Sequence, residues 1–216
     1  MNTIVERFNK IKSNINLLKP IKTVNIIAVS KTFPINHIQP LVDTGHNHFG
    51  ENKVQEAVSK WSQIKSQNQD LKLHMIGGLQ SNKARDAIKI FDYIHSLDNQ
   101  KLADVLAKHQ IILNKKLKYF IQVNIGNELQ KSGIPVSELD AFYNYCINEK
   151  KLEILGLMVI PPNDKDSKKY FTSLNELNTS LALQELSMGM SSDYIDAVSC
   201  GATFVRVGSS IFGNRS

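Results

Sequence analysis

The sequence predicts an α/β protein that folds as a single (β/α)8 TIM-type barrel with an additional N-terminal helix. Eight short apolar runs with strand character alternate along the chain with segments of helical periodicity. The 216 residues suit one short barrel. No Gly/Ser-rich linker or low-complexity tract divides the chain, so we expect one domain over residues 1–216. An open, doubly wound sheet is the alternative, because periodicity does not show whether a sheet closes.

The N-terminal segment, residues 1–20, predicts an amphipathic helix that packs outside the barrel. Its apolar residues stand at helical intervals among charged residues: Ile4, Phe8, Ile11, Ile15 and Leu18. A secretory signal would need a continuous apolar stretch, and Glu6 with the scarcity of arginine argues against a mitochondrial transit peptide.

The elements that follow are predicted in order from their residue patterns. Strands are expected at residues 24–30, 46–50, 71–77, 91–97, 118–126, 152–160, 183–189 and 203–208. Helices are expected at residues 35–44, 51–66, 81–90, 99–113, 136–150, 166–180 and 191–199, and a short closing helix at 209–213. The polar stretch 161–169 is expected to be a loop after the sixth strand.

Composition excludes several classes of protein. The apolar runs are only a few residues long, far short of the roughly 20 needed to cross a bilayer. The net charge is +6, but the lysines are scattered and no arginine-aromatic motif accompanies them, so we expect no nucleic-acid partner. A basic protein does attract small phosphate-bearing anions. Cys146 and Cys200 form no C-x-x-C pair, so we expect two reduced cysteines, no metal site and a cytoplasmic location.

A lysine, Lys31, stands at the end of the first predicted strand, within the stretch 26–34. The functional face of a (β/α)8 barrel is the carboxyl end of its strands, so this side chain is placed to react. An amine in an apolar barrel mouth loses part of its hydration, which favours the neutral form that adds to an aldehyde. Lys31 is therefore a candidate Schiff-base lysine, and a lysine that extends to solvent is the alternative.

Two turns rich in small residues follow the seventh and eighth predicted strands, at residues 187–193 and 207–213. Loops at these places, with backbone N–H groups at a helix start, form the recurrent phosphate site of this architecture. The residues that offer hydroxyl and amide donors are Ser191, Gly208, Ser209 and Ser210. Helix capping by the serines is the alternative, but the coincidence of both turns favours a phosphate site.

Three further polar residues lie near predicted strand ends: Asn52, His74 and Arg206. Alternation in the last strand puts Phe204, Arg206 and Gly208 on one face. If that face lines the barrel mouth, the guanidinium meets either a ligand heteroatom or a carboxylate. Asn52 is a neutral hydrogen-bonding group, although helix capping would also explain it. His74 is a candidate ligand contact, with a wall histidine satisfied by protein groups as the alternative, and we assign it no catalysis.

Six stretches together resemble, in order and along nearly the whole chain, the pyridoxal-phosphate homeostasis protein family (YggS/PROSC-like). They are AVSKTFP, HFGENKVQEA, HMIGGLQSNKAR, VNIGNELQKSGI, LEILGLMVIPP and LSMGMSSDYIDAVSCGATFVRVGSSIFG. The strings FGEN, LQSNK, LSMGMS and VRVG are among the most recognisable of that family.

The resemblance implies a fold type III barrel, related to the N-terminal domain of alanine racemase, that binds pyridoxal 5'-phosphate (PLP). Lys31 matches the Schiff-base lysine, and Arg206 matches the residue that faces the pyridine nitrogen. Phosphate binders and pocket positions are matched by Ser191, Gly208, Ser209, Asn52 and Met158, and we add His74 to the cofactor-binding set.

The function that this resemblance implies is PLP homeostasis: the chain holds PLP on Lys31 and buffers it or delivers it to PLP-dependent apo-enzymes, without strong catalysis of its own. An arginine opposite the ring nitrogen favours the unprotonated nitrogen and weakens the cofactor as an electron sink. Racemisation also needs a second acid/base, which the racemase family obtains from a C-terminal domain, and this chain ends at Ser216. The alternatives are a PLP-dependent amino-acid racemase or related enzyme and a Schiff-base aldolase acting on a phosphosugar. We further expect a monomer.

Overall fold

The structure, a computed structural model, describes residues 3–128, 130–162 and 166–213. Its strands are β1 (Asn25–Val29), β2 (His48–Glu51), β3 (Lys72–Met75), β4 (Tyr93–Leu97), β5 (Lys118–Asn124), β6 (Ile134–Pro135), β7 (Glu153–Met158), β8 (Glu185–Ser187) and β9 (Phe204–Val207). Its helices are α1 (Thr3–Leu17), α2 (Ile35–Asp43), α3 (Val54–Gln67), α4 (Ala84–Ile90), α5 (Gln100–Leu113), α6 (Leu139–Asn144), α7 (Ser167–Ser180), α8 (Tyr194–Ser199) and α9 (Ser209–Phe212). Tight 3-10 turns at Ser81–Lys83 and Val136–Glu138 precede α4 and α6, and a π-helical turn at Tyr145–Glu149 follows α6.

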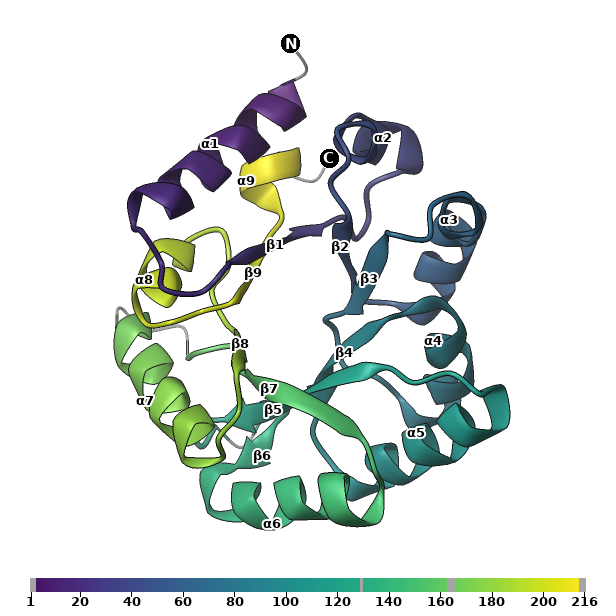
Figure 1. Ribbon diagram of the computed structural model, residues 1–216, viewed down its shortest axis with the longest axis vertical. Coiled ribbons are helices and arrows are strands. Elements are labelled where there is room, and N and C mark those ends of the chain that lie inside the picture. The colour runs from purple at the N-terminus through teal and green to yellow at the C-terminus, as the bar shows by residue number, and fades with distance from the viewer. Residues whose placement is uncertain (1–2, 129, 163–165, 214–216) are drawn as a thin grey trace.

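Eight parallel strands close into a barrel with helices around it, which confirms the predicted (β/α)8 fold (Figure 1). The strand order is β4-β3-β2-β1-β9-β8-β7-β5, and a further pairing of β4 with β5 closes the ring. The open-sheet alternative is wrong because the first and last strands pair over four residues each, from Asn25 with Phe204 to Ala28 with Val207. The two-residue β6, which pairs with β5, was not expected.

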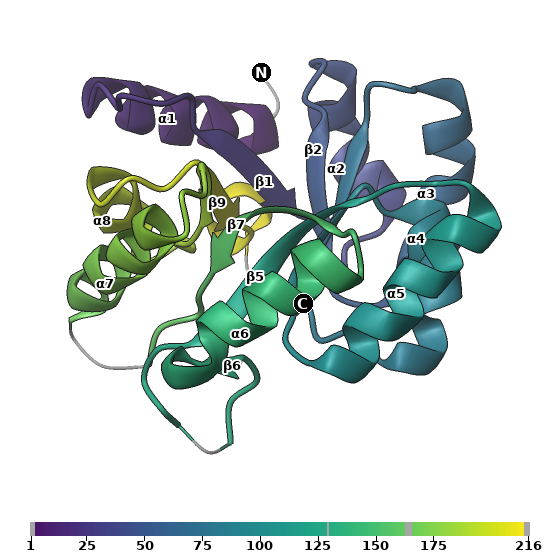
Figure 2. The same ribbon diagram turned by 60° about the horizontal axis from the view of Figure 1, so that its bottom comes forward.

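Helix α1 lies outside the barrel beside α8 and α9, as the amphipathic pattern predicts (Figures 1 and 2). Its buried side chains are Ile4, Phe8, Ile11 and Ile15. Leu18 does not join them, because the helix ends at Leu17 and the Leu18 side chain is exposed. In the described part of the chain, every helix is too short or too polar to span a membrane.

Side-chain alternation divides the buried residues of the strands into two sets. Val205 and Val207 point outward into the core shared with the helices. The opposite face of β9 points into the barrel, where Phe204 joins a separate apolar cluster. The other buried members of this interior cluster are Ile27, Tyr93, Phe120 and Met158. The last strand therefore presents Arg206 to the barrel interior, on the face that the alternation predicted.

Element boundaries differ from the predictions by a few residues. The largest difference is at the helix expected over residues 136–150, where α6 spans only Leu139–Asn144 between a 3-10 turn and a π-helical turn. The helix expected from residue 51 begins at Val54, because Glu51 still belongs to β2. The helix expected from residue 191 begins at Tyr194, because Met190 N donates to Asp193 Oδ1 at 2.6 Å and the chain makes a turn first. Of the predicted loop 161–169, residues 163–165 lie outside the described residues.

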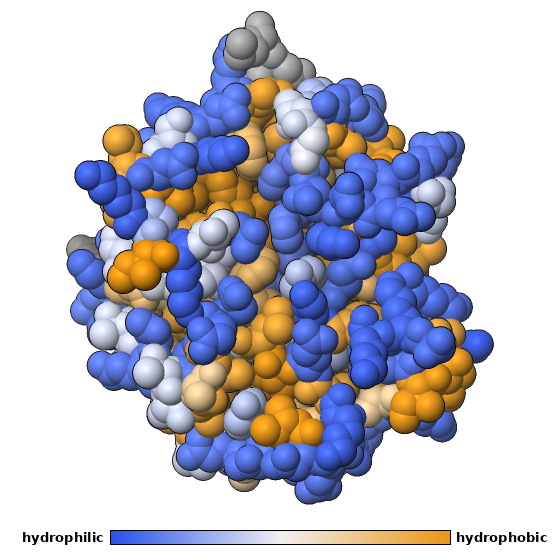
Figure 3. Space-filling view, in the orientation of Figure 1, coloured by the Kyte–Doolittle hydropathy of each residue, from blue (hydrophilic) through white to orange (hydrophobic). Residues whose placement is uncertain are grey.

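In the face shown in Figure 3, hydrophilic side chains dominate and apolar patches are scattered among them.

Candidate functional site

A cavity of about 680 Å³ lies at the carboxyl ends of the barrel strands. It brings together six of the eight predicted site residues: Lys31, Asn52, Ser191, Arg206, Gly208 and Ser209. Apolar walls come from residues that sequence reasoning did not select: Val29, Phe33, Ile76, Ile160 and Met190. The cavity thus combines one amine, one guanidinium and several neutral donors within a partly apolar wall, which is the usual make-up of a small-molecule site.

The backbone on both sides of Lys31 is held from outside the barrel. Thr32, the next residue, has a φ of 69°, in the left-handed region that a β-branched residue rarely adopts. Its N–H donates to Glu56 Oε1 at 2.6 Å. On the other side, Lys60 Nζ donates to the carbonyl oxygen of Ser30 at 2.9 Å. Helix α3, which carries Glu56 and Lys60, therefore fixes the turn that presents Lys31 to the cavity.

The same cluster contains a fully buried carboxylate, Glu51, which points outward from β2 toward α3. Its Oε1 atom accepts hydrogen bonds from Ser30 Oγ at 2.7 Å, Trp61 Nε1 at 2.9 Å and Lys60 Nζ at 3.0 Å. Burial is the largest influence on this carboxyl group and raises its pKa, while Trp61 and Lys60 act in the opposite direction. Sequence reasoning missed this cluster, because it placed Glu51 at the start of a helix and not at the end of the buried strand β2.

The two small-residue turns meet through Ser191. Its Oγ accepts hydrogen bonds from the backbone N–H groups of Gly208 at 3.3 Å and Ser210 at 3.4 Å. Neither Ser191 nor Ser209 is the N-cap residue of the helix that follows it, because Asp193 is the N-cap of α8 and Gly208 is the N-cap of α9. Ser191 Oγ instead accepts from the first turn of α9, a contact between segments distant in sequence. A Cβ on Gly208 would lie 3.3 Å from Val29 Cβ, so glycine permits the close approach of this turn to β1. Hydroxyl and amide groups at such a turn suit the oxygens of an anion.

Arg206 projects into the barrel interior and is buried. It donates to the carbonyl oxygens of Ser187 and Val159, both at 2.8 Å, and to Ser187 Oγ at 2.7 Å. Burial lowers its pKa to about 10, so the group stays charged at neutral pH. The carboxylate-pair alternative is wrong within the described residues, because every hydrogen-bond partner of the guanidinium there is a neutral oxygen. These bonds use three of the five N–H groups of the guanidinium, and Arg206 also lines the cavity.

Asn52 contributes a hydrogen-bond acceptor to the cavity wall. Among the described residues, its buried Oδ1 has no hydrogen-bond partner. The capping alternative is wrong here too, because Lys53 is the N-cap of α3 and no side chain caps that helix. Since buried polar atoms are nearly always satisfied, this oxygen indicates a donor supplied by a ligand or water.

His74 and Met158 are absent from the lining of this cavity. The two ring nitrogens of His74 are both used within the protein, at 2.9 Å from His48 and at 2.9 Å from His95. We therefore correct the prediction for His74: it is a histidine satisfied by protein groups, because the barrel interior surrounds it completely. Met158 is fully buried in the interior apolar cluster.

The chain matches known proteins along nearly its whole length. The family model described as alanine racemase, N-terminal domain, matches residues 7–216. The pyridoxal phosphate homeostasis protein of Haemophilus influenzae is 39% identical over 204 residues, which cover 90% of this chain and 86% of that protein. The protein of the same name from Aquifex aeolicus is 38% identical and covers 88% of this chain and 86% of its own.

Solved structures give the same picture. PipY of Synechococcus elongatus, solved with PLP bound, superposes with a TM-score of 0.86 at 37% identity and covers 97% of this chain and 100% of its own. Alanine racemase of Clostridium difficile superposes with a TM-score of 0.74 at 14% identity and covers 99% of this chain but 57% of its own. The second likeness is one of fold alone.

Proposed function

Because this chain belongs to the pyridoxal phosphate homeostasis protein family, we propose that it binds PLP in the cavity at the carboxyl ends of the strands and buffers or delivers this cofactor. The observation that carries the proposal is the convergence of Lys31, the Ser191–Gly208 contact and Arg206 on one cavity. The relative PipY, at 37% identity, has a structure with PLP bound, which supports the same assignment.

The residues present fit this cofactor. Bound PLP supplies a reactive aldehyde and a phosphate group on an aromatic ring. Lys31 offers a primary amine for a reversible Schiff base with the aldehyde. The phosphate is assigned to Ser191, Gly208 and Ser209, at a turn where glycine permits the close approach to Val29 of β1. The unpartnered Asn52 Oδ1 is an acceptor for which a bound ligand would supply a donor.

Arg206 favours a carrier over a catalyst. A guanidinium offers donors and no acceptor, so Arg206 would favour the unprotonated state of a ring nitrogen placed opposite it, whereas strong PLP catalysts usually place an acidic partner there. Among the described residues that line the cavity, Lys31 is also the one side chain suited to proton transfer, because the lining contains no His, Asp, Glu, Tyr or Cys. Racemisation would need such a group on each face of the substrate. We therefore propose a carrier without strong catalysis. We further propose that it acts as a monomer and passes PLP to apo-enzymes.

The experiment that tests the proposal is borohydride reduction of the purified chain with PLP, followed by proteolysis and mass spectrometry. We expect a phosphopyridoxyl group on the Lys31 peptide. Lys31→Arg keeps the charge but removes the primary amine, and we expect no label. The matched control is Lys118→Arg. Lys118 lies at the amino end of β5, away from the cavity at the carboxyl ends of the strands, so this variant should label like the wild type.

Three results would overturn parts of the proposal. An unlabelled Lys31 in the presence of PLP contradicts the cofactor assignment. If borohydride instead traps a ketose phosphate on Lys31, the result favours the aldolase alternative over the PLP carrier. Conversion of L-alanine to D-alanine over many turnovers by the PLP-loaded chain, measured by chiral chromatography and lost in Lys31→Arg, contradicts the carrier role and favours the racemase alternative.

A further inference from the structure

A line of hydrogen-bonded side chains crosses the barrel interior and ends at Arg206. His48 Nδ1 lies 2.9 Å from His74 Nε2, and His74 Nδ1 lies 2.9 Å from His95 Nε2. The line continues from His95 Nδ1 to Ser187 Oγ at 2.8 Å, and Arg206 Nη1 donates to that oxygen at 2.7 Å. We call His48, His74, His95 and Ser187 the histidine line.

The histidine line climbs from the amino end of the barrel toward the carboxyl end. His48 begins β2 and pairs in register with Lys72, and His74 lies two residues further along β3. His74 pairs with Tyr93, and His95 again lies two residues further along β4. From β4 the line crosses to β8 on another side of the barrel, between residues 92 positions apart in sequence. It therefore connects the two ends of the barrel through its centre.

The two middle rings of the line, His74 and His95, are fully buried among aromatic side chains. His74 stacks on Tyr93 with ring centres 4.3 Å apart, and His95 stacks on Phe120 at 4.4 Å. Burial lowers the pKa of both His74 and His95 well below 6.5. The imidazoles lie in series instead of converging on one point, and the described residues contain no group of three ligands that could hold a metal ion. The ring nitrogens of His74 and His95 therefore serve as hydrogen-bonding groups and not as metal ligands.

Neutral rings in series give the line one of two directions. A neutral imidazole has one N–H and one bare nitrogen, so a ring bonded at both nitrogens must donate on one side and accept on the other. His74 and His95 are both in this position. Either each ring donates toward Ser187, or each ring donates away from it. The tautomers of the line must therefore change together.

Arg206 selects between the two directions. Its cationic N–H donates to Ser187 Oγ, and hydrogen bonds in a chain strengthen one another when all donate in the same sense. Ser187 then donates to His95 Nδ1, His95 Nε2–H donates to His74, and His74 Nε2–H donates to His48 Nδ1. We propose that the histidine line is a positioning device for Arg206, directed away from the cofactor cavity, and that protonation of His48 reverses it.

The reversed state differs from the first by a single proton. Protonated His48 carries hydrogens on both ring nitrogens and can only donate to His74. His74 and His95 then each hold their single hydrogen on Nδ1, and Ser187 keeps its own hydroxyl hydrogen. Ser187 Oγ now accepts from both His95 and Arg206, so the Arg206 hydrogen bond loses its onward acceptor and weakens.

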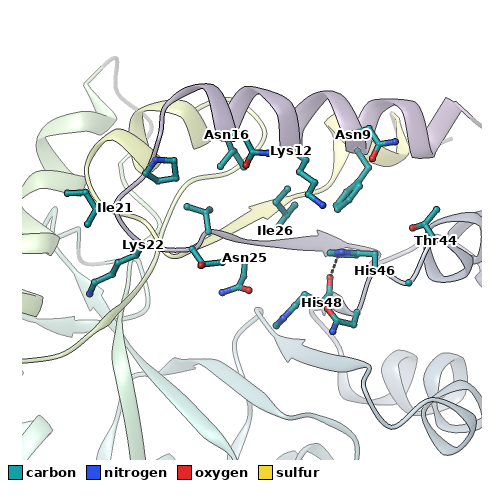
Figure 4. Close-up of a pocket in the computed structure, with 17 residues that line it drawn as sticks. Asn9, Lys12, Asn16, Ile21, Lys22, Asn25, Ile26, Thr44, His46 and His48 are labelled. Atoms are coloured by element: carbon teal, nitrogen blue, oxygen red, sulfur yellow. Dashed lines mark hydrogen bonds between the residues drawn. The ribbon is translucent and has the colours of Figure 1, made fainter.

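His48 is placed to exchange protons with solvent. It lines a cavity of about 740 Å³ between α1 and the amino ends of β1 and β2, at the opposite end of the barrel from Lys31 (Figure 4). Burial and the charge of Lys72 lower the pKa of His48 below 6.5, while Asp92 acts in the opposite direction. The titratable and charged groups around it are His46 before β2, Lys72 and His74 on β3, Asp92 and Tyr93 at β4, and Lys12 and Lys22 across the cavity.

The test is the position of each imidazole proton, read from two-bond 1H–15N spectra of the full chain without added ligand. We expect the proton on Nε2 of His48, His74 and His95 at neutral pH. As His48 titrates below pH 6.5, the protons of His74 and His95 should move to Nδ1 with the same midpoint. A proton on Nδ1 of either buried ring at neutral pH overturns the assigned direction. Unchanged tautomers while His48 titrates overturn the coupling.

Three variants test whether the reversal of the histidine line depends on the titration of His48. His48→Gln keeps a hydrogen-bonding group but does not titrate, so the reversal should be absent, and a retained midpoint contradicts the proposal. His48→Phe is the second variant if the amide disturbs folding, and it should also abolish the reversal. His109→Gln, on α5 and outside the histidine line, is the control and should leave the reversal unchanged.

The effect on the cofactor rests on the proposed function. In the PLP-loaded chain, the absorbance of the bound cofactor should shift with the midpoint of His48 and should lose this shift in His48→Gln. If reversal occurs without any shift, the link to Arg206 is wrong. If PLP does not load, the proposed function fails, and the spectra of the chain without ligand still decide on the histidine line.

Discussion

Lys60→Met is the substitution that most directly tests how the Lys31 turn is held. The Lys60 side chain is 9% exposed and Glu51 is fully buried, and their N–O distance is 3.0 Å. Methionine keeps the apolar stem but removes the hydrogen bonds to Glu51, Glu56 and the Ser30 carbonyl. The buried carboxylate would keep the donors from Ser30 and Trp61 and lose its cation.

The expected cost follows from this geometry. Breaking a buried ion pair costs about 3–5 kcal/mol, because one charge is left uncompensated. Two donors remain on Glu51, so we expect a loss of about 3 kcal/mol, near the lower end of that range. Glu56 is about a quarter exposed, so its lost contact adds less than about 1 kcal/mol. The assay is urea unfolding at neutral pH, with Lys89→Met as control, because the exposed Lys89–Asp86 pair should contribute below about 1 kcal/mol.

The pH dependence provides a second check. The folded-state pKa of Glu51 is raised above its ordinary value of 4.5, so the folded state binds this proton more tightly than the unfolded state. Stability from this group is therefore highest below pH 4.5 and falls as pH rises through the folded pKa. Lys60→Met raises that pKa further, so its cost should shrink as the pH falls toward 4.5.

Two results would refute the reasoning. A cost below about 1 kcal/mol at neutral pH would mean that Lys60 is not needed to compensate Glu51. A cost that does not change with pH would mean that the loss comes from packing. The double variant Lys60→Met with Glu51→Gln should recover at least about 2 kcal/mol of the loss, because it removes the uncompensated charge.

Three further predictions concern other sites. Ser191→Ala should weaken PLP binding about 10-fold, or about 1.4 kcal/mol, in a fluorescence titration, because it removes a donor hydroxyl and the acceptor for Gly208 N–H; Ser199→Ala should have no effect, and equal affinities would contradict the phosphate assignment. Tyr119→Phe should stabilise the fold by about 1 kcal/mol in urea unfolding, because the buried Tyr119 hydroxyl has no partner among the described residues; a loss of stability would reveal one. Gly156→Ala should cost more than about 3 kcal/mol, because its Cβ would lie 1.7 Å from the Glu185 carbonyl oxygen, whereas Gly78→Ala meets nothing within 4 Å and should be neutral.

The sequence by itself determined the elements and their order. Strand and helix patterns depend on neighbours within a few residues, so the periodicity located the principal strands and helices to within a few residues. The sites at strand ends followed from the same logic. Parallel strands present their carboxyl ends at one face, and Lys31, Asn52, Ser191 and Arg206 all follow or end such strands.

Only the tertiary structure decided the contacts between distant segments. Closure of the barrel depends on β1 meeting β9, which no local pattern encodes. The support of the Lys31 turn by Glu56 and Lys60 depends on how α3 packs against β1 and β2. The role of His74 depends on partners contributed by β2 and β4. The sequence predicted it as a ligand contact, but in the structure it belongs to the histidine line inside the barrel. The physical reason is the same in each case: hydrogen-bond partners are chosen by distance in space, and the fold brings them together from far apart in the chain.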